Sequence, residues 1–599
     1  MSLELVAIIG VVLVVAVSVI APRVGVAAPL LLVVLGVAVT FLPFVDRVTV
    51  PPEWILGGIL PPLLYSTAVS TPSMEFRRDF RLISLFSVIL VVITAVLVGL
   101  VACALVPGLP LGIGIALGAI VSPTDAVATS VIRQAGVSQR IVTVLEGESL
   151  LNDASALVLL RSAVAAVGVS ISIWQVSVDF LWAVAAAVAI GWVVGGLNLA
   201  IRARITQVTS NVTLSLVVPF LAYLPAEHLD ASGLVATVTA GLVTGYGAPR
   251  RLGAEERIAE RTVWRTVELL LESAVFLLVG LEAPSLAADV VEAGGGLGLA
   301  VLVAVLAATC AIAIRAGFVA WSLWSLARRN RRAPAVRDRL AELQEQIADG
   351  QVPDFGASDP QLAQGGGNHR KSRRRARQMA RRASAGAVSS EERVSRWQQM
   401  LRKRVADLDY LAAEKLGWRE GVMLVWAGMR GAVTIAAAQT LPSDTQHRSL
   451  LILVATLVAV GTLLIQGSTL GWLADRLGLT GRAGEVDPEQ WDALQAELNR
   501  AAFDRLTSGE LTSFPPELVE KARSRIARTP RPDDDDFRPG SPAMKARMEQ
   551  FQRLRLDLIG AQRDALLDLR DLGAYPSAVL DAALAQLDAD QIGIELHQH

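Results

Sequence analysis

Apolar stretches of about 20 residues recur along the first 474 residues of this 599-residue chain, and they restrict the folds open to it. The stretch 82–106, for example, contains no charged residue. A helix needs about 20 apolar residues to cross the hydrocarbon core of a bilayer. Hydrophobic residues make up 53% of the chain, and soluble cores stop growing near ~250–300 residues, so one large soluble core is excluded. We predict an all-α polytopic membrane protein.

Thirteen of these stretches are predicted to span the membrane. They are 3–20, 25–44, 53–71, 82–106, 111–131, 141–168, 176–200, 210–226, 231–247, 265–282, 297–327, 418–441 and 448–474. The predicted organisation is a membrane domain with the first eleven spans (1–327), a basic and partly disordered insert (328–417), the last two spans (418–474) and an acidic helical tail (475–599).

The charges of the connecting loops predict the orientation of the spans. Short loops on one side carry Arg23, Arg77, Arg78, Arg81, Arg133, Arg140, Arg202, Arg204, Arg250, Arg251, Arg257 and Arg261. The only arginines in the loops on the other side are Arg47 and Arg448. Because loops rich in arginine stay in the cytoplasm, we expect a multi-pass plasma-membrane protein with its N-terminus outside and its C-terminus cytoplasmic.

The two soluble segments carry opposite charges. The insert 328–417 has a net charge of +9 and contains the run RKSRRRARQMARR at 370–382. The tail 475–599 has a net charge of −7. The run is interpreted as a solvated cytoplasmic loop or as a site for anionic lipid or the acidic tail, but not for nucleic acid, because it is tethered at the membrane. We expect the two segments to attract each other and to modulate the activity.

The span 111–131 contains the sequence Ser122-Pro123-Thr124-Asp125. Pro123 removes a backbone donor and should break the helix within the membrane. Carbonyl groups freed by such a break can face a cavity and bind a cation. The alternative is a simple kink at which Asp125 caps the resumed helix.

The span 141–168 carries four polar side chains in two neighbouring pairs. Ser149 and Asp153 are four residues apart and share one helix face, and Glu148 and Asn152 share the adjacent face. Hard monovalent cations prefer oxygen ligands, and a carboxylate in a low dielectric also takes up a proton readily. One carboxylate that holds either a cation or a proton is the minimum for ion exchange. The alternative is a purely structural polar cluster.

Arg430 lies about halfway along the span 418–441. An unpaired guanidinium there is costly, so we expect a structural ion pair with Glu148, which leaves Asp153 free to titrate. Other charged residues in the spans are expected to be interfacial or paired. These are Arg161, Glu268, Glu272 and Arg315.

At these residues the sequence resembles the sodium/proton exchanger family, the electroneutral, NhaP-like branch of the monovalent cation:proton antiporters. The matching motifs are LPPLLY (60–65), SPTDAVA (122–128), GESLLND (147–153), FLLVGL (276–281), GMRGA (428–432) and QG (466–467). Their order and spacing cover most of 1–474. The resemblance implies two inverted six-helix repeats after an extra first helix, with discontinuous fifth and twelfth helices that cross near the midplane. It also implies a homodimer and an elevator-like motion of the core.

The resemblance also implies roles for individual residues. Asp153 would be the essential carboxylate for the cation and the proton. Its neighbour Asn152 replaces a second Asp found in electrogenic relatives, which implies one-for-one exchange. The metal site for Na⁺ or another monovalent cation would be formed by Asp153, Asp125, Ser149 and Thr124. Glu148 and Arg430 would form the buried pair. Some members carry a Glu where this chain has Ser66, so Ser66 and Thr67 are candidate accessory residues.

We therefore expect a secondary active transporter rather than an enzyme. It would exchange Na⁺, or K⁺ or Li⁺, for H⁺ electroneutrally in pH and sodium homeostasis, with no cofactor besides the transported ions. Its partners would be membrane lipid and a second copy of the chain. The alternatives are a gated monovalent cation channel, a K⁺-selective cation/proton exchanger, and a membrane sensor whose soluble parts carry the function.

Overall fold

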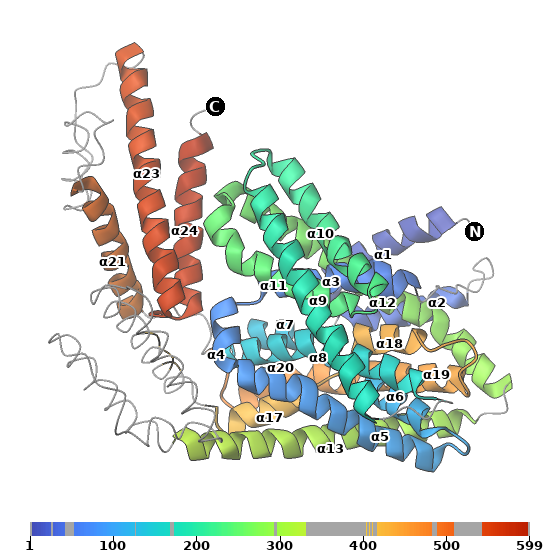
Figure 1. The fold of residues 1–599 in the computed structure, drawn as a ribbon. Coiled ribbons are helices and arrows are strands. Elements are labelled where there is room, and N and C mark those ends of the chain that lie inside the picture. Colours follow the sequence, from blue (N-terminus) through green and yellow to red (C-terminus); the bar gives the residue numbers. More distant parts are fainter. Residues whose placement is uncertain are drawn as a thin grey trace. The chain divides into compact units, whose positions relative to one another are not determined.

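The computed structural model describes residues 3–24, 28–41, 53–125, 127–167, 173–292, 296–330, 416–481, 488–507 and 542–596, together with residues 403, 407 and 410. All regular elements in these ranges are helices (Figure 1). Most of the insert 328–417, including the basic run 370–382, lies outside the described residues. The expected attraction between this run and the acidic tail, and the predicted domain boundaries, stay predictions.

The first group of helices ends at residue 165. They are α1 (Leu3–Val24), α2 (Ala28–Thr40), the π-helical η1 (Trp54–Ile59), α3 (Leu60–Ser70), α4 (Ser73–Ser84), the π-helical η2 (Leu85–Leu90), α5 (Val91–Leu105), α6 (Leu111–Val121), α7 (Val127–Gln134) and α8 (Gln139–Ala165).

Five long helices follow. These are α9 (Ile173–Arg202), α10 (Val208–His228), α11 (Gly233–Arg251), α12 (Ala254–Glu292) and α13 (Leu297–Asn330). Shorter helices follow, namely α17 (Trp418–Trp426), α18 (Ala432–Gln439), α19 (Arg448–Thr462), the π-helical η3 (Leu463–Gly467) and α20 (Ser468–Arg476). The tail contains α21 (Pro488–Thr507), α23 (Pro542–Leu572) and α24 (Ser577–Leu596).

Each of the thirteen predicted spans overlaps one of these helices or a helix broken in two. Among the described residues, six helices are long and apolar enough to cross a membrane by length and composition alone. The count of thirteen spans and the inverted repeats remain predictions. Several boundaries differ from the prediction, most of all in α12, which extends from Ala254 to Glu292 where the span 265–282 was predicted.

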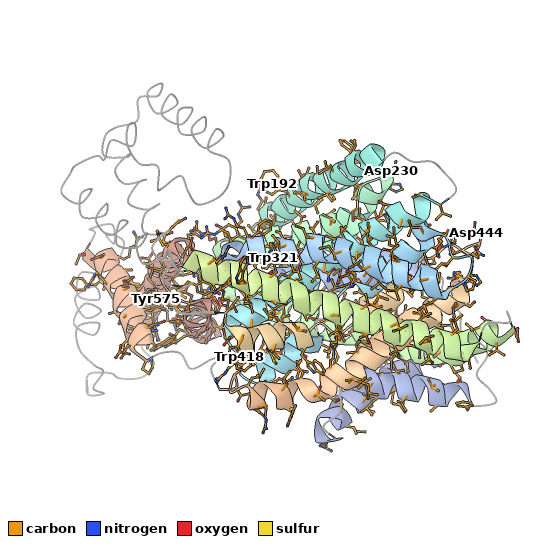
Figure 2. The ribbon with its side chains drawn as sticks, turned by 90° about the horizontal axis from the view of Figure 1, so that it is seen from below. Trp192, Asp230, Trp321, Trp418, Asp444 and Tyr575 are labelled. Carbon is orange, nitrogen blue, oxygen red and sulfur yellow. The ribbon has the colours of Figure 1, made fainter. Side chains whose placement is uncertain are left out.

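Large apolar side chains cover the outside of several helices. Trp192 on α9 and Trp321 on α13 are both more than half exposed, and Figure 2 labels them. Leu97 on α5 and Val305 on α13 are also exposed. An apolar surface of this kind would cause a soluble protein to aggregate, whereas hydrocarbon solvates it. The exposed surface therefore agrees with a protein embedded in lipid.

Two of the predicted outer loops lie toward the same end of the helices. In Figure 2, Asp230 and Asp444, from two predicted outer loops, lie toward one end of the helices, and Trp418, which follows the predicted cytoplasmic insert, lies toward the other. The arrangement agrees with the alternation of the loops. Which end faces the cytoplasm stays a prediction.

Two helices are interrupted, and their interruptions touch. The first separates α6 from α7 after Val121, as Pro123 predicts, and the second separates α17 from α18 around Met429. The Asp125 backbone N–H donates to the Met429 carbonyl oxygen at 2.8 Å. Non-helical backbone is tolerated at membrane depth only where protein or a water-filled cavity surrounds it. The second interruption thus supplies a carbonyl oxygen that accepts a hydrogen bond from a backbone amide of the first.

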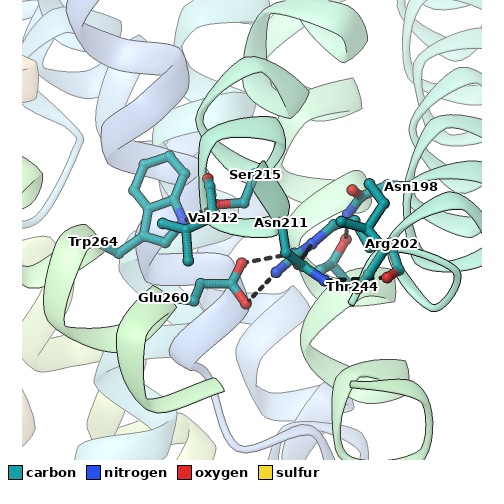
Figure 3. A network of polar contacts seen from close by, with 9 residues as sticks. Asn198, Arg202, Asn211, Val212, Ser215, Thr244, Glu260 and Trp264 are labelled. Atoms are coloured by element: carbon teal, nitrogen blue, oxygen red, sulfur yellow. Dashed lines mark hydrogen bonds and ion pairs between the residues drawn. The ribbon is translucent and has the colours of Figure 1, made fainter. Parts of the chain in front are cut away.

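A fully buried arginine joins α9 to α12 (Figure 3). Both terminal nitrogens of Arg202 donate to the Glu260 carboxylate at 2.8 Å, and its Nε donates to Asn211 Oδ1 at 2.6 Å. Such a bidentate pair is geometrically specific and leaves few of its hydrogen-bonding groups unsatisfied. It explains how Glu260, near the polar start of α12, can be buried, because Arg202 is its partner within the helix bundle.

Two further hydrogen bonds extend this network to α10 and α11 (Figure 3). The indole N–H of Trp264 donates to Ser215 Oγ at 3.2 Å. The Asn198 amide donates to Thr244 Oγ1 at 3.1 Å. Four helices are therefore held in register at the Arg202 end by directional contacts as well as by apolar packing.

The tail helix α24 contacts the ends of α4 and α12. The backbone N–H of Ser577, at the start of α24, donates to Glu75 Oε1 at 3.0 Å. Asp588 accepts hydrogen bonds from Arg257 at 2.5 Å and from Arg563 at 2.9 Å. The acidic tail thus binds an arginine of the membrane domain.

Glycines allow α5 and α6 to pack closely. A Cβ atom at Gly118 of α6 would overlap the Ala95 carbonyl group of α5, and one at Gly114 would lie 2.8 Å from the Gly99 carbonyl oxygen. Small residues at such contacts let helix backbones approach one another in membranes. The α5–α6 contact supports the first interruption, because α6 leads directly into it.

Gly118→Ala should lower the thermal stability of the purified protein in detergent. Its methyl group meets backbone rather than a flexible side chain, and overpacking of this kind costs ~1–3 kcal/mol. Gly196→Ala on α9, where a Cβ has no neighbour within 4 Å, is the matched control. Unfolding midpoints measured by size-exclusion chromatography after heating test this. Equal midpoints for the two variants would contradict the close contact.

Candidate functional site

The helix α8 passes beside both interruptions and carries four buried polar side chains. Glu148, Ser149, Asn152 and Asp153 each expose at most 6% of their surface. Ser149 Oγ donates to the Thr124 carbonyl oxygen at 2.8 Å. The Asn152 amide donates to the Ser122 carbonyl oxygen at 3.3 Å. α8 therefore binds two of the carbonyl groups that the first interruption releases.

A cavity lies between α3, α8, α12 and the two interruptions. Its lining includes four carboxylates, which belong to Asp125, Asp153, Glu268 and Glu272. No lysine, arginine or histidine is among the described residues that line it. A concentration of negative charge in a low dielectric is unfavourable unless cations or protons compensate it. The cavity is therefore suited to small cations.

Neutral oxygen atoms complete the lining. Thr67, Thr124, Ser149 and Thr434 contribute hydroxyl or carbonyl oxygens. Thr434 Oγ1 and Asp153 Oδ1 are buried and have no hydrogen-bond partner within the described part of the chain. Buried polar atoms are normally satisfied, so two unsatisfied oxygens on one cavity indicate a place for an ion. Carboxylate, hydroxyl and carbonyl oxygens are the ligands that hard cations prefer.

The structure brings most of the predicted site residues together. Asp153, Asp125, Ser149 and Thr124 line the one cavity, and so does the accessory candidate Thr67. Asn152 does not line it and instead holds the first interruption. Ser66 also lies outside the lining, but its hydroxyl donates to Glu268 Oε2 at 3.0 Å. The roles of these residues in binding remain predictions.

Three residues of the cavity were not identified from the sequence. Glu268 and Glu272 were expected to be interfacial or paired, and that interpretation needs correction because both face the cavity. Their spacing of four residues on an apolar helix was the available signal. Thr434 gave no comparable signal, because the only polar residue within four positions of it is Arg430.

The expected ion pair between Glu148 and Arg430 is also corrected. The Glu148 carboxylate pairs with Arg315 of α13, with Oε1 bound to Nη1 and Oε2 bound to Nη2 at 2.8 Å. Arg315 Nε donates to the Leu424 carbonyl oxygen at 2.8 Å. Both side chains are at least 98% buried. A buried charge needs a partner, as the prediction assumed, but the partner of Glu148 is Arg315 rather than Arg430.

Arg430 binds carbonyl groups instead of a carboxylate. Its Nε donates to the Val121 carbonyl oxygen at 2.9 Å, and its Nη1 donates to the Gly428 carbonyl oxygen. These carbonyls lie at the C-terminal ends of α6 and α17, where the helix dipole concentrates negative charge. Its backbone N–H donates to Thr462 Oγ1 at 3.0 Å. A cation at two helix C-termini explains why Arg430 needs no acidic partner of its own.

Comparisons with known proteins place the chain among ion exchangers. The profile of the family described as "Sodium/hydrogen exchanger, transmembrane" matches residues 9–336 and 400–476. An uncharacterized Na⁺/H⁺ exchanger of Mycobacterium tuberculosis is 28% identical over 96% of this chain and 93% of its own length. A sodium, potassium, lithium and rubidium/H⁺ antiporter of Bacillus pumilus is 29% identical over 50% of this chain and 46% of its own length.

The fold is also similar to a solved structure. The sodium proton antiporter MjNhaP1 of Methanocaldococcus jannaschii superposes with a TM-score of 0.52 at 17% identity. The superposition covers 79% of this chain and 99% of that protein.

Arg315→Met should destabilise the protein strongly. It leaves the buried Glu148 carboxylate without its partner, which costs ~3–5 kcal/mol. The double variant Glu148→Met with Arg315→Met should regain much of this loss, because it removes both charges together. Unfolding midpoints of the three purified proteins test this. A single variant as stable as the wild type would contradict the pairing.

Proposed function

The chain belongs to the sodium/hydrogen exchanger family, and from this premise we propose that Asp153 is the carboxylate at which a monovalent cation and a proton compete. It is a multi-pass membrane protein of a family of cation/proton antiporters rather than enzymes. The observation that carries the proposal is the buried Asp153 Oδ1, which faces the cavity without a hydrogen-bond partner among the described residues. Oxygens of Asp125, Ser149 and Thr124 surround the same cavity.

Competition at one carboxylate is sufficient for coupled exchange. Asp153 binds a cation on one side of the membrane and releases it on the other when a proton replaces it. The carboxylate returns only when one of the two ions neutralises it, because an unpaired charge is costly away from water. Glu148 takes no part in this cycle, since Arg315 neutralises it.

The exchange is proposed to be electroneutral. Asn152, next to Asp153, is neutral and engaged with the Ser122 carbonyl oxygen, so this turn of α8 supplies one titrating carboxylate. One proton then replaces one cation. The proposed physiological role is pH and sodium homeostasis at the plasma membrane, by a homodimer with its N-terminus outside.

Na⁺ is the proposed cation, and K⁺-selective exchange is the second candidate. The names of the M. tuberculosis and M. jannaschii proteins specify sodium. The B. pumilus relative is described as accepting potassium, lithium and rubidium as well. Competition between these cations in proteoliposomes distinguishes the two, because the preferred ion drives exchange at the lowest concentration.

Asp153→Asn should abolish cation-induced dissipation of a pH gradient in everted membrane vesicles, because the amide cannot alternate between a proton and a cation. Asp444→Asn, at an exposed loop carboxylate, is the matched control and should retain wild-type activity. Both variants should be present in the membrane at equal amounts. Exchange that survives in Asp153→Asn, or cation conductance without proton movement in the wild type, would overturn the proposal.

Electroneutrality predicts that an imposed membrane potential leaves the exchange rate unchanged. Proteoliposomes with equal pH and cation gradients, but with potentials of opposite sign, provide the measurement. A rate that follows the potential would show that unequal charges cross in the two directions.

A further inference from the structure

The cavity contains more negative charge than one competing carboxylate requires. Beyond Asp153 and Asp125, it is lined by Glu268 and Glu272 of α12. These two glutamates are four residues apart, so their carboxylates project from the same face of α12, one turn apart. Neither is part of the proposed exchange at Asp153, and their presence needs a separate explanation.

The charges around these glutamates leave the pair without full compensation. The charged groups that act on Glu272 are the carboxylates of Asp125 and Glu268. Arg133 and Arg265 act on Glu268, but Arg133 is well exposed and forms an ion pair with Glu146. Arginines in such exposed positions are screened by water and give little compensation.

The position of Glu268 is fixed by a neighbouring helix. Ser66 on α3 is 4% exposed, and its hydroxyl donates to Glu268 Oε2 at 3.0 Å. A glutamate that only faced water would not need a buried donor. The hydrogen bond fixes the Glu268 carboxyl group, which lines the cavity, to a buried side chain of α3.

A second observation indicates that the cavity contains an unused ligand besides the carboxylates. Thr434 is fully buried, lines the same cavity, and its Oγ1 has no hydrogen-bond partner among the residues that the structure describes. Together with Asp153 Oδ1, it provides unsatisfied oxygens at the interruptions. The glutamates therefore extend an existing ion cavity along α12 rather than forming an isolated acidic cluster.

We propose that Glu268 and Glu272 form a second position for a monovalent cation in this cavity, and that Ser66 positions Glu268 for it. The cation waits at this position while Asp153 is protonated and moves to Asp153 when the proton leaves. This inference rests on the proposed exchange at Asp153. It assigns to α12 a role in cation affinity and leaves proton competition to α8.

Binding measurements on purified protein separate the two positions. With NaCl as the probe, isothermal titration of Asp153→Asn should detect residual Na⁺ binding, weaker than in the wild type. Adding Glu268→Gln and Glu272→Gln to that variant should abolish the residual binding. Loss of all Na⁺ binding in Asp153→Asn alone would overturn the second position, while the exchange assay on the same variant judges the proposed function independently.

Kinetics in proteoliposomes give a second measurement. Glu268→Gln should raise the Na⁺ concentration for half-maximal exchange about fivefold, the effect of one partly hydrated charge at close range, with the maximal rate unchanged. Ser66→Ala should raise it less, and Ser66→Thr should restore it because the hydroxyl is retained. Glu255→Gln, at an exposed position on the same helix, is the matched control.

Two outcomes of the kinetic assay would contradict the proposal. If the effect of Glu268→Gln disappears when choline chloride raises the ionic strength, the glutamates attract Na⁺ only by long-range electrostatics and do not bind it. Unchanged kinetics in both Glu268→Gln and Glu272→Gln would show that neither carboxyl group contributes to cation affinity. Size-exclusion profiles equal to the wild type would confirm that each variant is folded.

Discussion

The architecture depends on satisfying backbone groups where two helices are broken inside a low-dielectric protein. Each unsatisfied carbonyl or amide there costs several kcal/mol in hydrocarbon. Arg430 binds the carbonyl groups of Val121 and Gly428, and the side chains of α8 bind those of Ser122 and Thr124. The polar cavity exists because these contacts leave the remaining oxygens of the interruptions open on one side.

Charge compensation separates the structural acids from those that face the cavity. Glu148 is buried beside the cavity but is neutralised by Arg315, and Glu260 is neutralised by Arg202. Asp153, Glu268 and Glu272 line a cavity to which no basic side chain contributes among the described residues. In the proposed exchange, transported ions are the counter-charges of the second group. This division places ion-paired helix contacts and a carboxylate-lined cavity within a few turns of the same helices.

Several features of the site could be predicted from the sequence because they depend on local chemistry. Pro123 marks the first interruption, and the spacing of Ser149 and Asp153 places them on one face of α8. The partner of Glu148 could not be predicted, because the choice between Arg315 and Arg430 depends on the rotation of α13 and on the path of the interrupted chain between α17 and α18. The glutamates of α12 were misplaced for a related reason. The predicted span began at residue 265, so Glu268 looked terminal, whereas the helix begins at Ala254 and places it well inside.

The hydrogen bond from Asp125 N–H to the Met429 carbonyl joins two segments that are far apart in the chain, and it uses only main-chain atoms. Apart from proline at position 125, which has no N–H to donate, a side-chain replacement does not remove a bond of this kind directly. The contact between the two interruptions therefore does not depend on a particular side chain at Asp125 or Met429, although Gly431 leaves no room for a Cβ beside the Asp125 carboxylate. The main-chain atoms of these residues thus join the two interruptions, while side chains of the same segment, such as that of Asp125, line the cavity.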